Sequence, residues 1–256
     1  MTKRIDDISV YYKPVNIAEI VLFIIFLFMT ILSILIPNII SNEYEYERNI
    51  LQIIFLITIM ASFLTSMILR FRLVPYAESM RRKQLLSDSY GTPLTTKRTV
   101  KYYNNYYPPG PSKLGTNILE NSFFSKSICN HMLIKKRIST AILLFIWLAV
   151  VFYRNSSFDL LLWITQLAFG SGLIVSWINL EILESRFNEV YDHLYTHFHQ
   201  NVGDTGPESV ALILNEFSSY ESAKSAASIT LSTKIFNEKN EELSAEWEEI
   251  KSDLKM

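Results

Sequence analysis

Three long stretches of this 256-residue sequence contain no charged side chain, and they constrain the fold more than any other feature. They cover residues 20–42, 49–69 and 160–180. About 20 helical residues, each rising about 1.5 Å, cross the roughly 30 Å hydrocarbon core of a bilayer, whereas a buried helix of a soluble domain rarely stays uncharged for so long. The pattern predicts three membrane-spanning helices.

A fourth apolar segment, residues 138–153, is shorter. Three basic residues precede it and Arg154 follows it. Long basic side chains can reach the membrane surface from such positions, which makes a short span tolerable. A helix buried in a soluble core is the alternative, but the chain would then cross three times and its two large polar regions would lie on opposite sides. We therefore predict an all-α membrane protein with four transmembrane helices.

The basic residues are distributed unequally about these segments. Of the 24 Lys and Arg side chains, 22 lie in residues 1–16, 70–137 and 181–256, and the two outer connections hold only Arg48 and Arg154. Connections rich in Lys and Arg stay in the cytoplasm. Both termini and the central region are therefore expected to be cytoplasmic. A signal peptide is disfavoured for the first span, because the apolar run is too long and no pair of small residues follows it.

These positions divide the chain into five parts. They are a cytoplasmic N-terminal segment (1–19), a first transmembrane hairpin (20–69), a basic cytoplasmic insert (70–137), a second transmembrane hairpin (138–180) and an acidic helical tail (181–256). The insert has 13 basic and 3 acidic side chains, a net charge of +10, and the tail has 6 basic and 15 acidic ones, a net charge of −9. Opposite charge favours docking of the tail on the insert, although exposed ion pairs contribute only about 0–1 kcal/mol each.

Apolar residues recur at helical spacing throughout the tail. The first stripe continues directly from the fourth span, and the last has steps that fit a heptad. The three stripes are Leu180, Leu183, Phe187, Val190, Leu194 and Phe198; Val210, Ile213, Leu214, Phe217 and Tyr220; and Phe236, Leu243, Trp247, Ile250 and Leu254. Their partners lie in the tail, in the insert or in neighbouring subunits, and charge favours the insert. In the insert itself, Pro75 predicts a helix kink.

The sequence has no motif for catalysis or for a cofactor. It lacks a phosphate-binding glycine loop, a Ser-His-Asp pattern and a cysteine cluster. Glu189, His193 and His197 are spaced four apart and could share a zinc ion, but the polar side of an amphipathic helix has the same pattern. Cys129, the single cysteine, excludes an internal disulfide. We expect neither an enzyme nor a metal site.

Small and hydroxyl-bearing residues form stripes on two of the predicted spans. Such stripes can line a neutral, water-filled path in an oligomer, but they more often mark helix contacts, where small residues let backbones approach. The candidates for pore lining are Thr58, Ser62 and Ser66 in the second span and Thr165, Gly172, Ser176 and Asn179 in the fourth. A coupled transporter is disfavoured, because no span contains an ionisable residue at membrane depth.

The insert combines tyrosines with basic residues. Aromatic faces stack on nucleobases and basic side chains neutralise phosphates, so the pairing suits a nucleotide or a short oligonucleotide. The candidate ligand-binding residues are Arg81, Arg82, Lys97, Arg98, Lys101, Tyr102, Tyr103, Tyr106 and Tyr107. The same composition also fits a membrane-proximal segment without a nucleotide, because tyrosines belong to the interfacial belt of membrane proteins and basic clusters attract anionic lipid.

The whole layout resembles a known class of membrane protein. Two spans, an insert with SDSYG, YYNN and ENSFFS, two further spans, and a tail with SSYESAKS and KIFNEKNEELSAEWEEIK are similar to the small four-span effectors of bacterial anti-phage systems. The resemblance implies a homo-oligomer in the bacterial inner membrane that senses a nucleotide signal, made by a nucleotidyltransferase partner, and opens a pore. It assigns no site residue. The alternative is a non-enzymatic membrane scaffold that recruits soluble partners through its helical tail.

Overall fold

The chain folds as two compact units that are built almost entirely of helices. The computed structural model describes residues 5–39, 44–97, 99–100, 102–103, 105–153, 161, 164–165, 172–200 and 206–256. Residues 6–81 and 97–99 form the hairpin unit, and residues 1–5, 82–96 and 100–256 form the bundle unit. The boundary between the units falls inside a helix, α3 (Val74–Tyr90), so a continuous helical backbone joins them.

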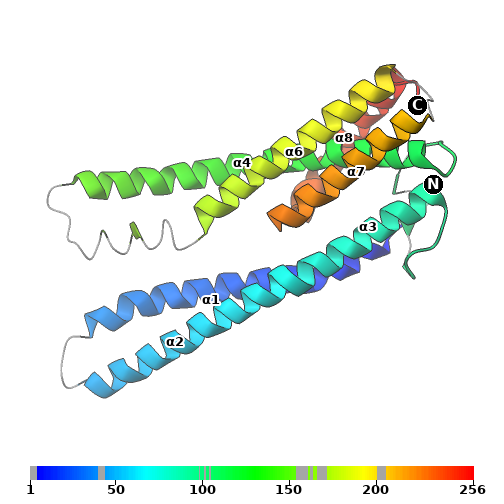
Figure 1. Cartoon of the computed structure of the whole chain (residues 1–256). Helices are drawn as coiled ribbons and strands as arrows, with labels where there is room; N and C mark the ends of the chain where they lie inside the picture. Colours follow the sequence, from blue (N-terminus) through cyan, green and yellow to red (C-terminus); the bar gives the residue numbers. More distant parts are fainter. Residues whose placement is uncertain are drawn as a thin grey trace. The chain divides into compact units, whose positions relative to one another are not determined.

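The hairpin unit is a pair of antiparallel helices in which α1 and α2 lie side by side and α3 continues α2 (Figure 1). Two-residue strands, β1 (Ile5–Asp6) and β2 (Thr99–Val100), pair with each other, and Asp6 and Thr99 are their residues in this unit. The remaining elements are a 3-10 helix η1 (Asp7–Tyr12), α1 (Lys13–Asn38), α2 (Glu45–Ile68) and a π-helix η3 (Leu69–Leu73).

The less exposed positions of the hairpin follow a heptad pattern on both helices. Alternating steps of three and four residues place one continuous seam on each helix, as in an antiparallel coiled coil. The seam of α1 contains Val15, Ala18, Leu22, Ile25, Met29, Leu32 and Ile36, and that of α2 contains Leu51, Phe55, Thr58, Ser62, Thr65 and Leu69. The two helices therefore contact each other through narrow stripes and leave most of their circumference outside.

The π-helix η3 shifts the seam by one residue. After Leu69, the partly buried Leu73 and the buried Val74 and Ala77 pack with Val15, so two adjacent residues, Leu73 and Val74, face the cluster. The N–H of Val74 bonds to the carbonyl of Leu69, and this i→i+5 bond accommodates the additional residue. Pro75 follows directly and has no N–H to bond to the carbonyl four residues earlier. The distortion predicted at Pro75 is thus a π turn immediately before it.

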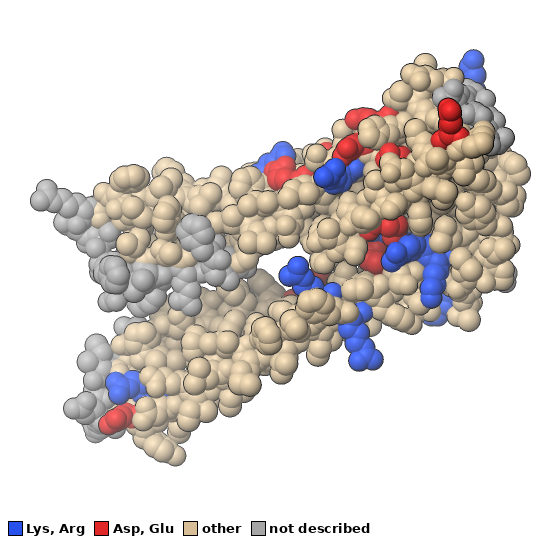
Figure 2. Space-filling model, viewed as in Figure 1, with Lys and Arg blue, Asp and Glu red and all other residues tan. Residues whose placement is uncertain are grey.

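The outward faces of α1 and α2 consist of exposed, large apolar side chains. Two helical stretches, Asp7–Pro37 and Glu45–Tyr90, are long and apolar enough to cross a membrane, and almost none of their most apolar residues are buried. On the visible surface of the hairpin, no charged side chain shows along the middle of the two helices, between the first turns of α2 and η3 (Figure 2). The prediction of two apolar helices of membrane length in the first half of the chain is confirmed.

The predicted third and fourth spans differ from α1 and α2, because neither is a long, unbroken apolar helix. The uncharged end of α4 (Pro111–Phe152) begins at residue 138, so only 15 helical residues, about 22 Å, are apolar. In the predicted fourth span, Gly172 has φ +70, and α6 (Leu173–Gln200) begins after it. The segment 160–180 is therefore not one unbroken helix, and most of its first half lies outside the described residues.

The bundle unit packs the tail against the insert. Alongside α4 and α6 it contains α7 (Pro207–Ala227) and α8 (Thr233–Asp253), and α4 contacts α6, α7 and α8. All six residues of the first tail stripe are buried in one core, together with Leu243, Trp247 and Leu254 of α8. The predicted docking of the tail on the insert is confirmed. In α7, however, Leu214 is 47% exposed, while the polar Ser209, Glu216 and Glu221 are buried.

Two phenylalanines of the bundle unit test which surfaces are core. Phe187 is fully buried in α6, whereas Phe145 in α4 is 73% exposed. We expect Phe187→Ala to reduce the stability of the detergent-solubilised protein by about 3–5 kcal/mol, because it leaves a cavity in the core. Phe145→Ala removes the same atoms from an outer surface and should change the unfolding temperature little. Equal shifts in the two thermal unfolding curves would contradict the assignment of the core.

Candidate functional site

A buried amide network holds the tyrosine-rich loop of the insert. Asn117 of α4, which is 0% exposed, donates to Asp88 Oδ2 and to Ser89 Oγ, both at 3.0 Å, and accepts from Asn105 Nδ2 at 2.6 Å. Lys113 lies 3.3 Å from the same Asp88 oxygen. Buried polar groups are costly unless they are paired, and here the end of α3, the loop and the start of α4 pair with one another. Asn105 of the loop is therefore held against the start of α4.

Two of the predicted ligand-binding cations make contacts inside the hairpin unit. Arg81 donates to both carboxylate oxygens of Asp6, at 3.0 and 2.9 Å, and its guanidinium lies 5.7 Å from the ring centre of Tyr12. Lys97 Nζ lies 5.6 Å from the ring centre of Tyr11. A bidentate Arg–carboxylate pair is among the stronger ion-pair geometries. Arg81 therefore fastens the N-terminal segment to α3.

The other predicted ligand-binding residues that are described lie in the bundle unit. Arg82 Nε is 3.4 Å from Glu221 Oε2 of α7, and the hydroxyl of Tyr103 accepts a hydrogen bond from Asn121 at 2.9 Å. Tyr102 and Tyr103 meet edge to face at 4.9 Å. Tyr106 is 90% exposed, and burial raises the pKa of Tyr107. Arg98 and Lys101 lie outside the described residues. The seven described candidates are therefore divided between the two units, and Tyr106 is the most accessible of them.

The pore-lining candidates of the second span lie on or beside the helix contact. Thr58 and Ser62 belong to the α2 seam, so they face α1, and Thr58 Oγ1 donates to the carbonyl of Ile54 at 2.7 Å. Thr65 repeats this bond one heptad later, to Ala61 at 2.8 Å. Ser66 alone of the predicted three is exposed. Within the hairpin, the hydroxyls of Thr58 and Ser62 occupy positions where small residues permit close helix packing.

The four candidates of the fourth span do not form one stripe. Thr165 Oγ1 accepts a hydrogen bond from Trp147 Nε1 of α4 at 2.9 Å, and the positive φ of Gly172 separates Thr165 from α6. Ser176 is half-buried in the first turns of α6. Asn179, the fourth candidate, lines a groove of the bundle. Because the helix is interrupted, periodicity across residues 165–179 does not correspond to one face.

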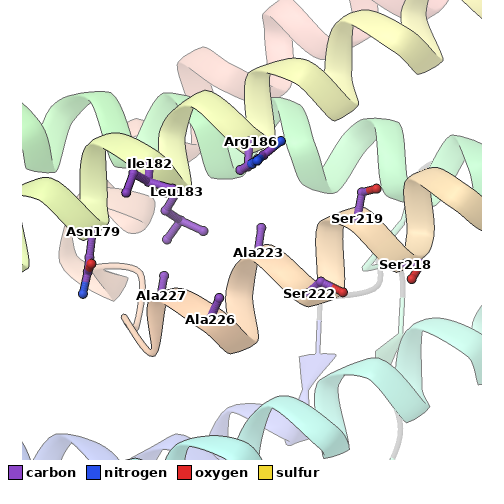
Figure 3. Close-up of a pocket in the computed structure, with 10 residues that line it drawn as sticks. All are labelled: Asn179, Ile182, Leu183, Arg186, Ser218, Ser219, Ser222, Ala223, Ala226 and Ala227. Carbon is purple, nitrogen blue, oxygen red and sulfur yellow. The ribbon is translucent and has the colours of Figure 1, made fainter.

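That groove lies between α6 and α7 and has a volume of about 490 Å³. Asn179 is at one end and Ser218 and Ser219 are at the other, with the alanines of α7 between them (Figure 3). Its lining comprises Asn179, Ile182, Leu183 and Arg186 of α6 and Ser218, Ser219, Ser222, Ala223, Ala226 and Ala227 of α7. The volume is in the range of small-molecule sites. Sequence reasoning missed this groove, although the run of small residues in α7 is visible in the sequence.

The groove offers little for a polyanion. Arg186 is the one cation among its described lining residues, and Arg186 Nη1 is paired with Glu189 at 2.9 Å. The rest of this lining is hydroxyl, amide or apolar. A nucleotide needs several cationic or N–H donors for its phosphates, so the groove suits a neutral ligand better.

His193 and His197 of α6 contact side chains of α7 and do not share a metal site among the described residues. His193 Nδ1 lies 3.1 Å from Glu216 Oε1, and His197 Nε2 lies 2.8 Å from Ser209 Oγ, both on α7. Among the described ranges, no three His, Cys, Asp or Glu side chains are grouped for a metal ion. His193 and His197 thus connect α6 to α7 along the antiparallel pair.

An ion pair joins α4 and α6 where the apolar part of α4 begins. Arg137 donates twice to Glu181, at 2.6 Å to each oxygen, and Trp177 Nε1 donates to the same carboxylate at 2.7 Å. The hydrogen bonds from Arg137 lower the pKa of Glu181. Tryptophan is a residue that is enriched at membrane–water interfaces.

Cys129 provides a chemical test of burial in α4. Desolvation raises the pKa of its thiol to about 12, because an ionised sulfur is disfavoured in the apolar core. At pH 8 the thiolate fraction is then about 1,000-fold smaller than for a thiol with the ordinary pKa of 9.0. We expect slow alkylation by iodoacetamide in the folded protein and rapid alkylation after denaturation. Rapid labelling of the folded chain at pH 8 would show that α4 is not packed as described.

The chain was also compared with known proteins. No protein-family model, no curated protein and no solved structure matches it.

Proposed function

We propose that this chain is a four-span protein of the bacterial inner membrane with both termini in the cytoplasm. The observation that supports this proposal most strongly is the outward surface of α1 and α2, which is apolar, exposed and long enough to cross a bilayer. An uncovered apolar surface of this extent in water would drive aggregation, whereas lipid covers it without cost. A signal sequence explains one such helix near the N-terminus but not the second.

The second hairpin completes this topology. The basic triplet at residues 135–137 precedes the uncharged end of α4, and the pair of Arg137 with Glu181 lies at the same level on α6. Basic residues at this place favour the cytoplasmic side. The short apolar part of α4 is compensated by local thinning of the bilayer and by the reach of the flanking basic side chains.

The function that we propose is that of a homo-oligomeric, ligand-gated pore that acts in anti-phage defence and responds to a nucleotide signal. Helices α4 and α6 belong to the bundle core and also continue into the apolar segments. A ligand that prefers one arrangement of the bundle would shift these helices and therefore the spans. Tyr106, which is exposed in the tyrosine-rich loop, is the described residue that we favour for stacking on a base. For pore lining we favour Ser66, which lies outside the α1–α2 seam, and Ser176 in the first turns of α6.

The scaffold alternative has less support. It depends on the heptad face of the last helix, but Leu243, Trp247 and Leu254 of that face are buried in the core of the bundle. Recruitment of a partner through the same face would require α8 to leave the bundle. We therefore favour the pore.

The topology is tested with reporter fusions. We expect green fluorescent protein at the C-terminus to be fluorescent and alkaline phosphatase at the same place to be inactive, because the fourth crossing returns the chain to the cytoplasm. Alkaline phosphatase inserted in the α1–α2 connection should be active. An active phosphatase at the C-terminus would mean an odd number of crossings and would exclude this topology.

The pore is tested by membrane potential. Cells that express the chain with a signal-producing nucleotidyltransferase are expected to lose the fluorescence of a potential-sensitive dye, whereas cells with either protein alone keep it. Tyr106→Ala should raise the signal concentration required about 5- to 150-fold, which corresponds to loss of one stacking contact. Tyr153→Ala, at another exposed tyrosine, is the matched control. Unchanged potential in the doubly expressing cells would refute the proposal.

A further inference from the structure

The π turn at the end of α2 presents three consecutive residues outward. Leu69 and Leu73 pack against the cluster of Val15, Val74 and Ala77, whereas Arg70, Phe71 and Arg72 between them are all exposed, Phe71 by 66%. An exposed aromatic residue therefore lies between two arginines in the sequence, on the outer side of the hairpin.

Nothing described in the chain neutralises these two arginines. Neither Arg70 nor Arg72 has an ion pair or a side-chain hydrogen bond among the described residues, whereas Arg81 in the same unit is paired with Asp6. The surface next to them is the exposed apolar face of α2, which includes Leu64, Met67 and Ile68. An apolar surface that ends in unpaired cations complements a lipid, whose acyl chains and phosphate lie in the same order.

We propose that Arg70, Phe71 and Arg72 form a binding site for anionic phospholipid headgroups. The inference rests on the proposed topology, which places this end of α2 at the cytoplasmic leaflet, where the anionic lipids are. Each guanidinium can donate two parallel hydrogen bonds to a phosphate, and Phe71 inserts at the level of the glycerol and the first acyl carbons. The net negative charge of the headgroup distinguishes this ligand from a zwitterionic lipid.

The test measures which lipid lies beside η3. Ile68→Cys, one turn before the site, is labelled with a bimane fluorophore, and the buried thiol of Cys129 leaves that label specific. The protein is reconstituted in vesicles of phosphatidylglycerol and phosphatidylcholine in which one or the other lipid is brominated. Bromine quenches at short range, so the two quenching curves give the relative affinity of the site for phosphatidylglycerol.

We expect a preference for phosphatidylglycerol of about 25-fold, which falls to about fivefold in Arg70→Gln or Arg72→Gln and to near unity in the double variant. These ratios correspond to about 1 kcal/mol per arginine. Arg48→Gln, which removes one positive charge at the opposite end of α2, is the matched control and should leave the ratio unchanged. Phe71→Ala should weaken quenching by both lipids equally.

Two kinds of result would refute the headgroup site, and one of them would also refute the proposed topology. Equal quenching by both lipids, or a preference that persists in the double variant, refutes the headgroup site while leaving α2 in the membrane. Absence of quenching by either lipid means that α2 lies outside the bilayer, which refutes the proposed topology together with the site.

Discussion

The apolar outward faces of α1 and α2 must be kept from water, and the rest of the architecture depends on how that is done. Each helix satisfies its own backbone hydrogen bonds, so the side chains alone decide the environment. The narrow seam combines apolar residues with small and hydroxyl ones, including Ala18, Ser62 and Thr65, and most of the other large apolar side chains lie outside it. At the base of the hairpin, polar side chains pair with one another: Arg81 binds Asp6, and Tyr12 donates to Glu78 at 2.9 Å. The hairpin is thus apolar on the outside along its length and has paired polar side chains at one end.

The bundle unit follows the opposite rule over most of its length. Its apolar residues point inward, and its buried polar groups, such as Asn117 and Glu216, have partners. Helix α4 obeys both rules in turn, because Leu133 is buried while Phe145 and Phe152, further along the same helix, are exposed. The change occurs near Arg137 and its pair with Glu181. One helix therefore connects a water-adapted core to a surface that is apolar on the outside.

Periodicity predicted much of this fold, but not the candidate residues. The charge-free runs predicted α1 and α2, and the apolar stripes of α6 and α8 predicted the core of the bundle. Both predictions succeed because residues three and four apart lie on the same face of a helix. Composition does not show which cations are already engaged: Arg81 and Arg82 are adjacent in α3, yet they bind Asp6 and Glu221, which are distant in sequence. The break at Gly172 was missed because glycine is common within spans, and only the backbone conformation shows that it precedes a new helix. Hydroxyls within a span are equally ambiguous, since the position of Ser62 in the seam depends on the register between α1 and α2.

The contact between α1 and α2 also depends on how far α2 is rotated about its own axis. An α-helix turns about 100° per residue, so the one additional residue in η3 sets the angle between the face of α2 that meets α1 and the face of α3 that packs beside it. Without that residue, an α2 fixed to α3 would be turned by about 100°, and its threonines and Ser62 would leave the contact with α1 while bulky isoleucines entered it. One additional residue in η3 therefore determines which face of α2 meets α1.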